Sequence, residues 1–213
     1  MDEPTFLTDT RAGYNTIAIP YDEMFGAETD TKPLTRAMFN AFAEIVAENG
    51  PVIEVGSGPG RVTAYLDGLG LDIRGIDLSP EMVALARRNF PKLRFEEGTM
   101  TALDLADGTL AGLVAWYSII HVPPALLPEV FAEFRRVLAP GGHLLLGFQV
   151  GDEAMHRTEA FGLTFSLVFQ RLMPERIEEL LAEAGFVVDA RLVRQPDEGE
   201  KVAQAHLLAH KPA

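Results

Sequence analysis

Apolar residues follow two spacings along the chain, one typical of helices and one typical of buried strands. From 34 to 49 they recur every three to four positions, which predicts a helix that Asn49, Gly50 and Pro51 end. The run 112–120 is apolar throughout, as in a strand covered on both faces. Strands are predicted over 51–55, 71–79, 92–98, 112–120 and 143–150, and further helices over 61–70, 81–90 and 123–138.

The C-terminal third is expected to complete the same sheet. We expect 151–162 to be irregular and 163–172 to form a strand, followed by an amphipathic helix over 174–185. Two last strands, 186–193 and 202–210, are separated by a charged turn and are expected to pair as an antiparallel hairpin. Such alternation predicts an α/β fold with a doubly wound, mostly parallel sheet and helices on both faces. Ligands of such sheets bind at the carboxyl ends of the strands.

Composition and charge restrict the possible partners. The 213 residues, 47% of them hydrophobic, suit one domain spanning 1–213, and a net charge of −13 disfavours nucleic acid as a partner. The absence of cysteine excludes a disulfide framework and thiolate ligands, and no histidine or carboxylate cluster follows the strands, so no metal site is expected. No apolar run approaches ~18 residues and the N-terminus lacks the pattern of a signal peptide, so we expect a cytoplasmic protein without a membrane span.

The segment VIEVGSGPGR, 52–61, joins the first strand to the next helix through glycines at alternate positions. A dinucleotide site would have G-x-G-x-x-G there, with an acid about 20 residues further on for the ribose. This loop has G-x-G-x-G instead, although Asp77 supplies the acid. Glu54, just before the loop, would repel a pyrophosphate and favours a ligand that carries an ammonium group.

Four segments in order, EVGSGPGR, GIDLSPEM, WYSIIHVPP and LAPGGHLLLGF, resemble the class I S-adenosylmethionine-dependent methyltransferases. The resemblance covers about 35–150, and the WYSIIH segment is similar to that of small bacterial members. It implies a Rossmann-like, seven-stranded sheet, S-adenosylmethionine as cofactor and S-adenosylhomocysteine as product. It also implies a small-molecule methyl acceptor for a protein that is a monomer or a homodimer.

The same resemblance assigns roles to the motif residues. Asp77 is expected to bind both ribose hydroxyls, and Glu54 to lie near the methionine ammonium. Thr99 stands where many relatives carry an aspartate that bonds the adenine amine, which leaves that contact open. The residues expected to contact the cofactor are Tyr14, Glu54, Gly56, Ser57, Gly58, Gly60, Arg61, Asp77, Leu78, Met82, Gly98, Thr99, Met100, Tyr117, Ser118 and His121.

The residues that bind the methyl acceptor are predicted from the two segments that lie outside the motifs. The segments 1–32 and 151–172 are expected to act as an N-terminal helical lid and as an insertion over the active site. Tyr14, Tyr117 and His156 are the candidate catalytic residues, and Tyr21, His156 and Arg171 are the candidates for binding the acceptor. Methyl transfer to oxygen or nitrogen by in-line displacement is then the expected reaction.

Several alternatives remain open from the sequence. Asp77 also has the position of a cap for the following turn, Met82 that of a core residue, and His121 that of a residue that holds its loop through a backbone hydrogen bond. A cofactor-binding relative without turnover fits the same motifs. A nicotinamide-dependent oxidoreductase fits less well, because of Glu54 and the loop spacing.

Overall fold

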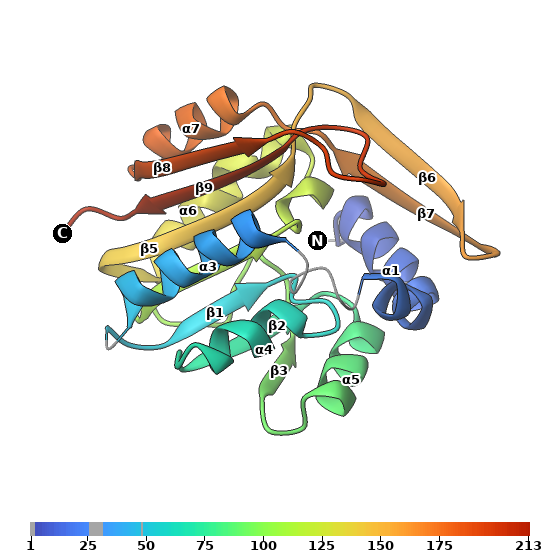
Figure 1. Ribbon diagram of the computed structural model, residues 1–213, viewed down its shortest axis with the longest axis horizontal. Coiled ribbons are helices and arrows are strands. Elements are labelled where there is room, and N and C mark those ends of the chain that lie inside the picture. The colour runs from blue at the N-terminus through green and yellow to red at the C-terminus, as the bar shows by residue number, and fades with distance from the viewer. Residues whose placement is uncertain (1–2, 26–31, 48) are drawn as a thin grey trace.

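The computed structural model describes residues 3–25, 32–47 and 49–213. Within them the predicted parallel core is confirmed: five parallel strands are extended by two antiparallel ones in the order β3-β2-β1-β4-β5-β9-β8 (Figure 1). The strands of this sheet are β1 (Val52–Val55), β2 (Ile73–Asp77), β3 (Arg94–Glu97), β4 (Leu110–Trp116), β5 (Leu138–Gln149), β8 (Val187–Arg194) and β9 (Gln204–His210). The expected C-terminal hairpin is therefore present as β8 and β9.

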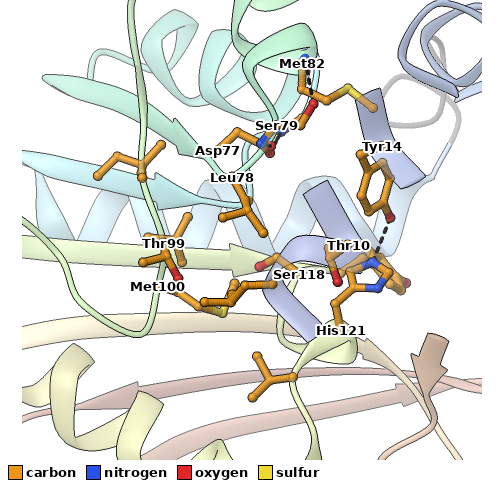
Figure 2. A pocket seen from close by; sticks show the side chains of 18 of the residues that line it. Thr10, Tyr14, Asp77, Leu78, Ser79, Met82, Thr99, Met100, Ser118 and His121 are labelled. Carbon is orange, nitrogen blue, oxygen red and sulfur yellow. Dashed lines mark hydrogen bonds between the residues drawn. The ribbon is translucent and has the colours of Figure 1, made fainter. Parts of the chain in front are cut away.

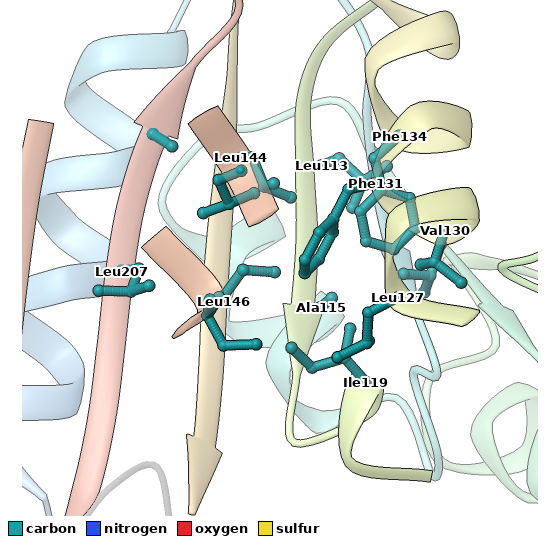
Figure 3. Packing of buried hydrophobic residues seen from close by; sticks show 14 of the residues in the cluster. Leu113, Ala115, Ile119, Leu127, Val130, Phe131, Phe134, Leu144, Leu146 and Leu207 are labelled. Carbon is teal, nitrogen blue, oxygen red and sulfur yellow. The ribbon is translucent and has the colours of Figure 1, made fainter. Parts of the chain in front are cut away.

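Helices cover both faces of the sheet because successive side chains of a buried strand point to opposite faces. On one face Leu113 and Ala115 of β4 pack with Phe131 and Phe134 of α6, as Figure 3 shows. On the other face Val114 packs in a cluster with residues of α3 and α4. The helices beside the sheet are α3 (Pro33–Val46), α4 (Arg61–Gly68), α5 (Pro80–Asn89), α6 (Leu127–Val137) and α7 (Pro174–Glu183).

Strand β4 is shorter than the apolar run 112–120 suggests. It ends at Trp116, and the chain turns at Tyr117, which has a φ of 52°, into the short 3-10 helix η1 (Ile119–His121). Ile119 and Ile120 stay buried under this turn, so their apolar character reflects packing against the core and not membership of the strand. A second 3-10 turn, η2 (Pro124–Leu126), leads into α6.

Segment 151–162 is not irregular as expected. It contains β6 (Ala154–Ala160), which pairs antiparallel with β7 (Leu163–Gln170) in a separate two-stranded hairpin. The side chains of β6 are partly or fully exposed on both faces, so the strand shows no apolar alternation from which it could be predicted. Its hydrogen bonds to β7 hold it instead.

The hairpin and the N-terminal helix α1 (Thr5–Phe25) lie side by side beyond the carboxyl ends of the parallel strands (Figure 1). Helix α1 packs on β7 and on α5, so it bridges the hairpin and the main sheet. The part of segment 1–32 that falls at 1–2 and 26–31 lies outside the described residues. None of the described helices is both long and apolar enough to cross a bilayer.

Candidate active site

Two adjoining cavities open among the described residues at the carboxyl ends of β1, β2 and β4, where sheets of this type bind ligands. The smaller chamber holds about 90 Å³ and lies between α1, the end of β2 and the start of α5. The larger chamber holds about 320 Å³ and extends from Glu54 to the β6–β7 hairpin. The two chambers share Tyr14, Tyr21, Gly56, Gly58, Trp116 and Tyr117.

Asp77 ends β2 at the wall of the smaller chamber, and its side chain is fixed by the backbone on both sides. One carboxylate oxygen accepts a hydrogen bond from the N–H of Gly58 (2.7 Å) and the other from the N–H of Ser79 (2.8 Å). Burial raises the pKa of Asp77 to about 6, and these hydrogen bonds oppose the rise. Asp77 therefore does cap the turn before Ser79, and each of its oxygens keeps a lone pair for a ligand.

Ser79 connects this corner to the N-terminal helix. Its hydroxyl accepts a hydrogen bond from the N–H of Met82 (3.1 Å), which caps α5, and donates one to the side-chain oxygen of Asn15 (2.7 Å) on α1. Figure 2 shows Ser79 and Met82 on the wall that faces Tyr14. The chamber is thus closed on one side by α1.

The glycines after β1 adopt left-handed backbone conformations, and two of them bound the chambers. Gly56 has a φ of 70°, and a Cβ there would lie 2.3 Å from the Cβ of Ser118. Gly58 has a φ of 52°, and a Cβ there would have no protein atom within 4 Å. Gly56 is therefore required by the packing of the loop on the turn after β4, whereas Gly58 leaves space on the cavity side.

Glu54 is 2% exposed and lines the larger chamber. One of its carboxylate oxygens accepts a hydrogen bond from the hydroxyl of Thr63 on α4 (2.5 Å). Burial raises the pKa of Glu54 to about 8, while hydrogen bonds from Thr63 oppose the rise. Its carboxyl group is therefore largely protonated at neutral pH until a cation enters the chamber.

Tyr14 and His121 form a chain of hydrogen bonds that joins three elements. The Nδ1 atom of His121 lies 2.9 Å from the carbonyl oxygen of Val168 on β7. Because a carbonyl only accepts, Nδ1 carries the proton, and Nε2 accepts from the hydroxyl of Tyr14 at 2.7 Å (Figure 2). Burial lowers the pKa of His121 to about 4 and raises that of Tyr14 well above its ordinary value. The pair is thus neutral, and His121 does hold its loop through a backbone hydrogen bond.

Tyr117 lies between the chambers in a backbone conformation that tyrosine seldom adopts. Its φ of 52° is in the left-handed region, while its N–H still donates to the carbonyl of Gly147 (2.8 Å). Its ring meets Trp116 edge to face with centroids 5.6 Å apart. The unfavourable backbone conformation places the ring at the junction of the chambers, and such strain is typical of functional sites.

The structure brings most of the expected cofactor residues together. Glu54, Ser57 and Arg61 line the larger chamber, where Arg61 is paired with Asp22 of α1 (2.8 Å). Gly60 lines neither chamber. A Cβ at Gly60 would lie 2.6 Å from the ring of Phe95, so this glycine is required by packing. The residues that line the smaller chamber as expected, besides those shared by both, are Asp77, Leu78, Met82, Gly98, Thr99, Met100, Ser118 and His121.

His156 is not brought to either chamber, and this corrects its assignment to the acceptor side. Alternation along β6 points Met155 and Arg157 into the larger chamber and His156 to the other face of the hairpin. There its Nε2 atom lies 2.9 Å from the hydroxyl of Ser166. Arg171 and Tyr21 do line the larger chamber.

Sequence reasoning missed further residues that line the chambers. Helix α1 contributes Phe6, Leu7 and Thr10, whose spacing relative to Tyr14 puts them on one helical face. The hairpin contributes Phe165 and Phe169, which lie on the same face of β7. Arg171, two positions after Phe169 and just beyond the end of β7, lines the same chamber. Both periodicities were available in the sequence as signals.

One cluster of potential metal ligands occurs in the described part of the chain, away from both chambers. His143, Asp189 and His210 place ligand atoms within 4.8 Å of one another. His143 lies in the middle of β5, with Asp189 on β8 and His210 at the end of β9, whereas Gln149 at the carboxyl end of β5 lines the larger chamber. Within the cluster, Nδ1 of His210 lies at hydrogen-bond distance from the carboxylate of Asp189 (2.8 Å), and none of the three residues lines either chamber.

The fold and the position of the chambers are those of Rossmann-like α/β proteins that bind a ligand over the first strand. Residues 52–142 match the family described as "Methyltransferase domain". This segment is less than half of the chain, and the solved structures below show that the chain has the fold of S-adenosylmethionine-dependent methyltransferases.

Curated relatives share part of their length with this chain. A demethylmenaquinone methyltransferase of Chlorobaculum parvum is 27% identical over 139 residues, which are 65% of this chain and 55% of that protein. The chain thus spans about half the length of the curated relatives that it matches.

Solved structures agree over more of the chain. The DhpI–SAH complex superimposes with a TM-score of 0.74 at 24% identity and covers 99% of both chains. An S-adenosylmethionine-dependent methyltransferase of Methanosarcina mazei gives a TM-score of 0.73 at 18% identity and covers 81% of this chain and 97% of that one. At these identities the likeness concerns the fold.

Proposed function

We propose that this chain transfers a methyl group from S-adenosylmethionine to an oxygen or nitrogen of a small molecule. The observation that carries the proposal is the position of Asp77. Its carboxylate stands at the end of β2 in a chamber that joins, past Gly56 and Gly58, a second chamber that contains Glu54. The two acids thus face the two parts of one elongated ligand that has hydroxyls at one end and an ammonium at the other.

The residues present fit this cofactor. Asp77 has acceptor capacity left for the ribose hydroxyls, and Leu78, Met82 and Met100 give the same chamber apolar walls for a flat base. The open space beside Gly58 lets the backbone approach the ligand. The hydroxyls of Ser57 and Ser118 are buried without a hydrogen-bond partner among the described residues, and both line the chambers. Such buried groups call for a bound ligand or water.

The cofactor supplies a methyl group on a sulfonium, so the protein has mainly to align the acceptor and exclude water. Tyr117 and Tyr14 line both chambers, and α1, which carries Tyr14, forms part of the wall of each. His121 is a weak base, because its pKa is near 4 and its Nε2 already accepts from Tyr14. The site therefore favours an acceptor atom that arrives as a nucleophile over one that must be deprotonated there.

The name of the Chlorobaculum parvum relative gives demethylmenaquinone as its acceptor. Our proposal for this chain names only the class of acceptor, a small molecule. Transfer to a small molecule agrees with the larger chamber, whose volume of about 320 Å³ is at the lower end of the usual range for small-molecule sites.

Calorimetry with S-adenosylhomocysteine tests the proposed cofactor directly. We expect dissociation in the micromolar range for this ligand and no heat of binding for NAD, because the loop has G-x-G-x-G in place of the G-x-G-x-x-G that holds a pyrophosphate. Binding of NAD in place of S-adenosylhomocysteine would refute the proposal. Mass spectrometry of incubations with S-adenosylmethionine and candidate acceptors then identifies transfer.

Binding of S-adenosylhomocysteine is expected to release a proton from Glu54. With its pKa raised to about 8, Glu54 is protonated in the free protein at pH 7, and the ligand ammonium favours the ionised form. Affinity should therefore rise between pH 6.5 and 8, by up to about tenfold per pH unit, and level off above pH 8. Reading the slope between pH 7 and 8 keeps Asp77 largely ionised, since its pKa is about 6.

The proton release is measured by calorimetry in buffers of different ionisation enthalpy. The Glu54→Gln variant is the control, because it keeps the size of the side chain and has no titrating group. We expect it to bind more weakly at pH 8 and to lose the pH dependence. An equal slope in both proteins would show that another group releases the proton.

A further inference from the structure

The wall of the larger chamber formed by the β6–β7 hairpin combines apolar rings with arginine. We infer that the methyl acceptor is a flat, apolar small molecule that carries an anionic group, a carboxylate or a phosphate, and that Arg171 binds this group. The inference rests on the proposed methyltransferase function and adds the chemical class of the acceptor.

Arg171 is a largely buried cation whose ion-pair partner in the described residues is one exposed and distant carboxylate. Its side chain is 20% exposed, and its Nε atom is buried with no hydrogen-bond partner among the described residues. The carboxylate of Glu153 lies 4.0 Å away, and that side chain is 81% exposed. A buried guanidinium N–H without a partner needs an acceptor, which a ligand in the chamber would supply.

Arg194, in contrast to Arg171, has a close ion-pair partner for its guanidinium. The Nε atom of Arg194 also lacks a partner, but its two terminal nitrogens are bound to Glu200 at 2.5 and 2.6 Å. Lys32 contacts the same carboxylate at 2.5 Å. Glu200 is therefore already neutralised by two cations and does not compensate Arg171.

The charge of this part of the chamber is opposite to that of the whole chain. The chain carries a net charge of −13, yet Arg157, Arg171 and Lys201 line the chamber on the hairpin side. In the described ranges neither Arg157 nor Lys201 has an ion-pair partner. Such a local excess of positive charge in an acidic protein favours an anionic ligand and raises its local concentration.

Aromatic side chains of the hairpin account for the apolar part of the acceptor. Phe161, at the turn, and Phe165 and Phe169, on β7, line the chamber together with Met155 of β6. Aromatic rings stack on flat ligands, and methionine fills irregular gaps beside them. An acceptor that lies along this wall would direct its anionic group to Arg171 and its reacting atom to Tyr117.

Naphthalene derivatives that differ only in their charged group test the inference without knowledge of the reacting atom. We would measure the binding of 2-naphthoate, 2-naphthyl phosphate, neutral 2-naphthamide and cationic 2-naphthylmethylamine by ligand-detected NMR, at saturating S-adenosylhomocysteine. At least one anion should bind about tenfold more tightly than the amide, and the amine should bind most weakly. The two anions distinguish a carboxylate site from a phosphate site.

The Arg171→Met variant should abolish the preference for anions, and Arg171→Lys should retain part of it. Arg176→Met on the exposed face of α7 is the matched control. It should change neither the affinity for the anionic probes nor the affinity for the amide. Unchanged affinity for S-adenosylhomocysteine in every variant shows that the fold and the cofactor site are intact, so a failure of the acceptor inference is distinct from a failure of the proposed function. Equal binding of anion and amide to the wild type, or no binding of any probe, would overturn the inference.

Discussion

Replacing Asp77 by alanine is expected to reduce the affinity for S-adenosylhomocysteine at least a hundredfold. The substitution removes the charged acceptor for two ribose hydroxyls, and hydrogen bonds to a charged group contribute about 1.5–3 kcal/mol each. It also removes the contacts that hold Gly58 and Ser79 in place. Calorimetry at pH 7.5 measures the loss, with the thermal unfolding midpoint as a check on the fold.

Asp72→Asn is the matched control for Asp77→Ala. Asp72 precedes the same strand, but its side chain is 68% exposed and pairs with Arg94 at the surface. Removal of an exposed charge there should leave the affinity within twofold of wild type. Retention of wild-type affinity in Asp77→Ala would mean that the smaller chamber does not hold the ribose.

Substitution of Gly58 by alanine should mainly reduce the affinity for S-adenosylhomocysteine, and substitution of Gly56 by alanine should mainly reduce the free energy of unfolding. At Gly58 the new methyl group meets no protein atom, so the cost in folding free energy is the left-handed backbone alone, about 1–2 kcal/mol. The methyl group faces the chambers, however, and affinity for S-adenosylhomocysteine should fall at least tenfold. At Gly56 the same group would lie 2.3 Å from the Cβ of Ser118, and overpacking raises the total cost to about 3 kcal/mol or more.

Denaturant unfolding and calorimetry on the two alanine variants distinguish these effects. Gly108→Ala serves as a control for the backbone term, since Gly108 has a φ of 65° on a surface turn remote from the chambers. It should lose stability like Gly58→Ala and keep full affinity. Equal affinity of Gly58→Ala and wild type would show that the ligand does not approach this part of the loop.

The parallel core and the cofactor side of the site were predictable because their signals are local. A buried strand leaves a continuous apolar run, and the loop at 52–61 combines glycines with Glu54 within a few positions. The acid that complements the loop, Asp77, ends the next strand, and parallel strands bring their carboxyl ends to the same edge of the sheet. Periodicity and strand order together therefore bring both acids to neighbouring strands, where each lines one of the chambers.

The acceptor side was predicted less well because its residues are brought together by long-range contacts. His156 was expected over the site, but the side to which a β6 side chain points depends on the pairing of β6 with β7, and β6 shows no apolar face to reveal it. The bond between Tyr14 and His121 spans 107 positions of the sequence, and no local pattern specifies it. The turn at Tyr117 ended β4 earlier than its apolar run suggested.

The contacts of helix α1 with both chambers have a consequence for ligand release. It forms one wall of the smaller chamber, and His121 joins its Tyr14 to β7, which lines the larger chamber. This hydrogen bond and the packing of α1 on β7 therefore connect the wall of one chamber to the wall of the other. A movement of α1 that widened the smaller chamber would then also shift the hairpin wall of the larger one, so that release of the two products would be coupled.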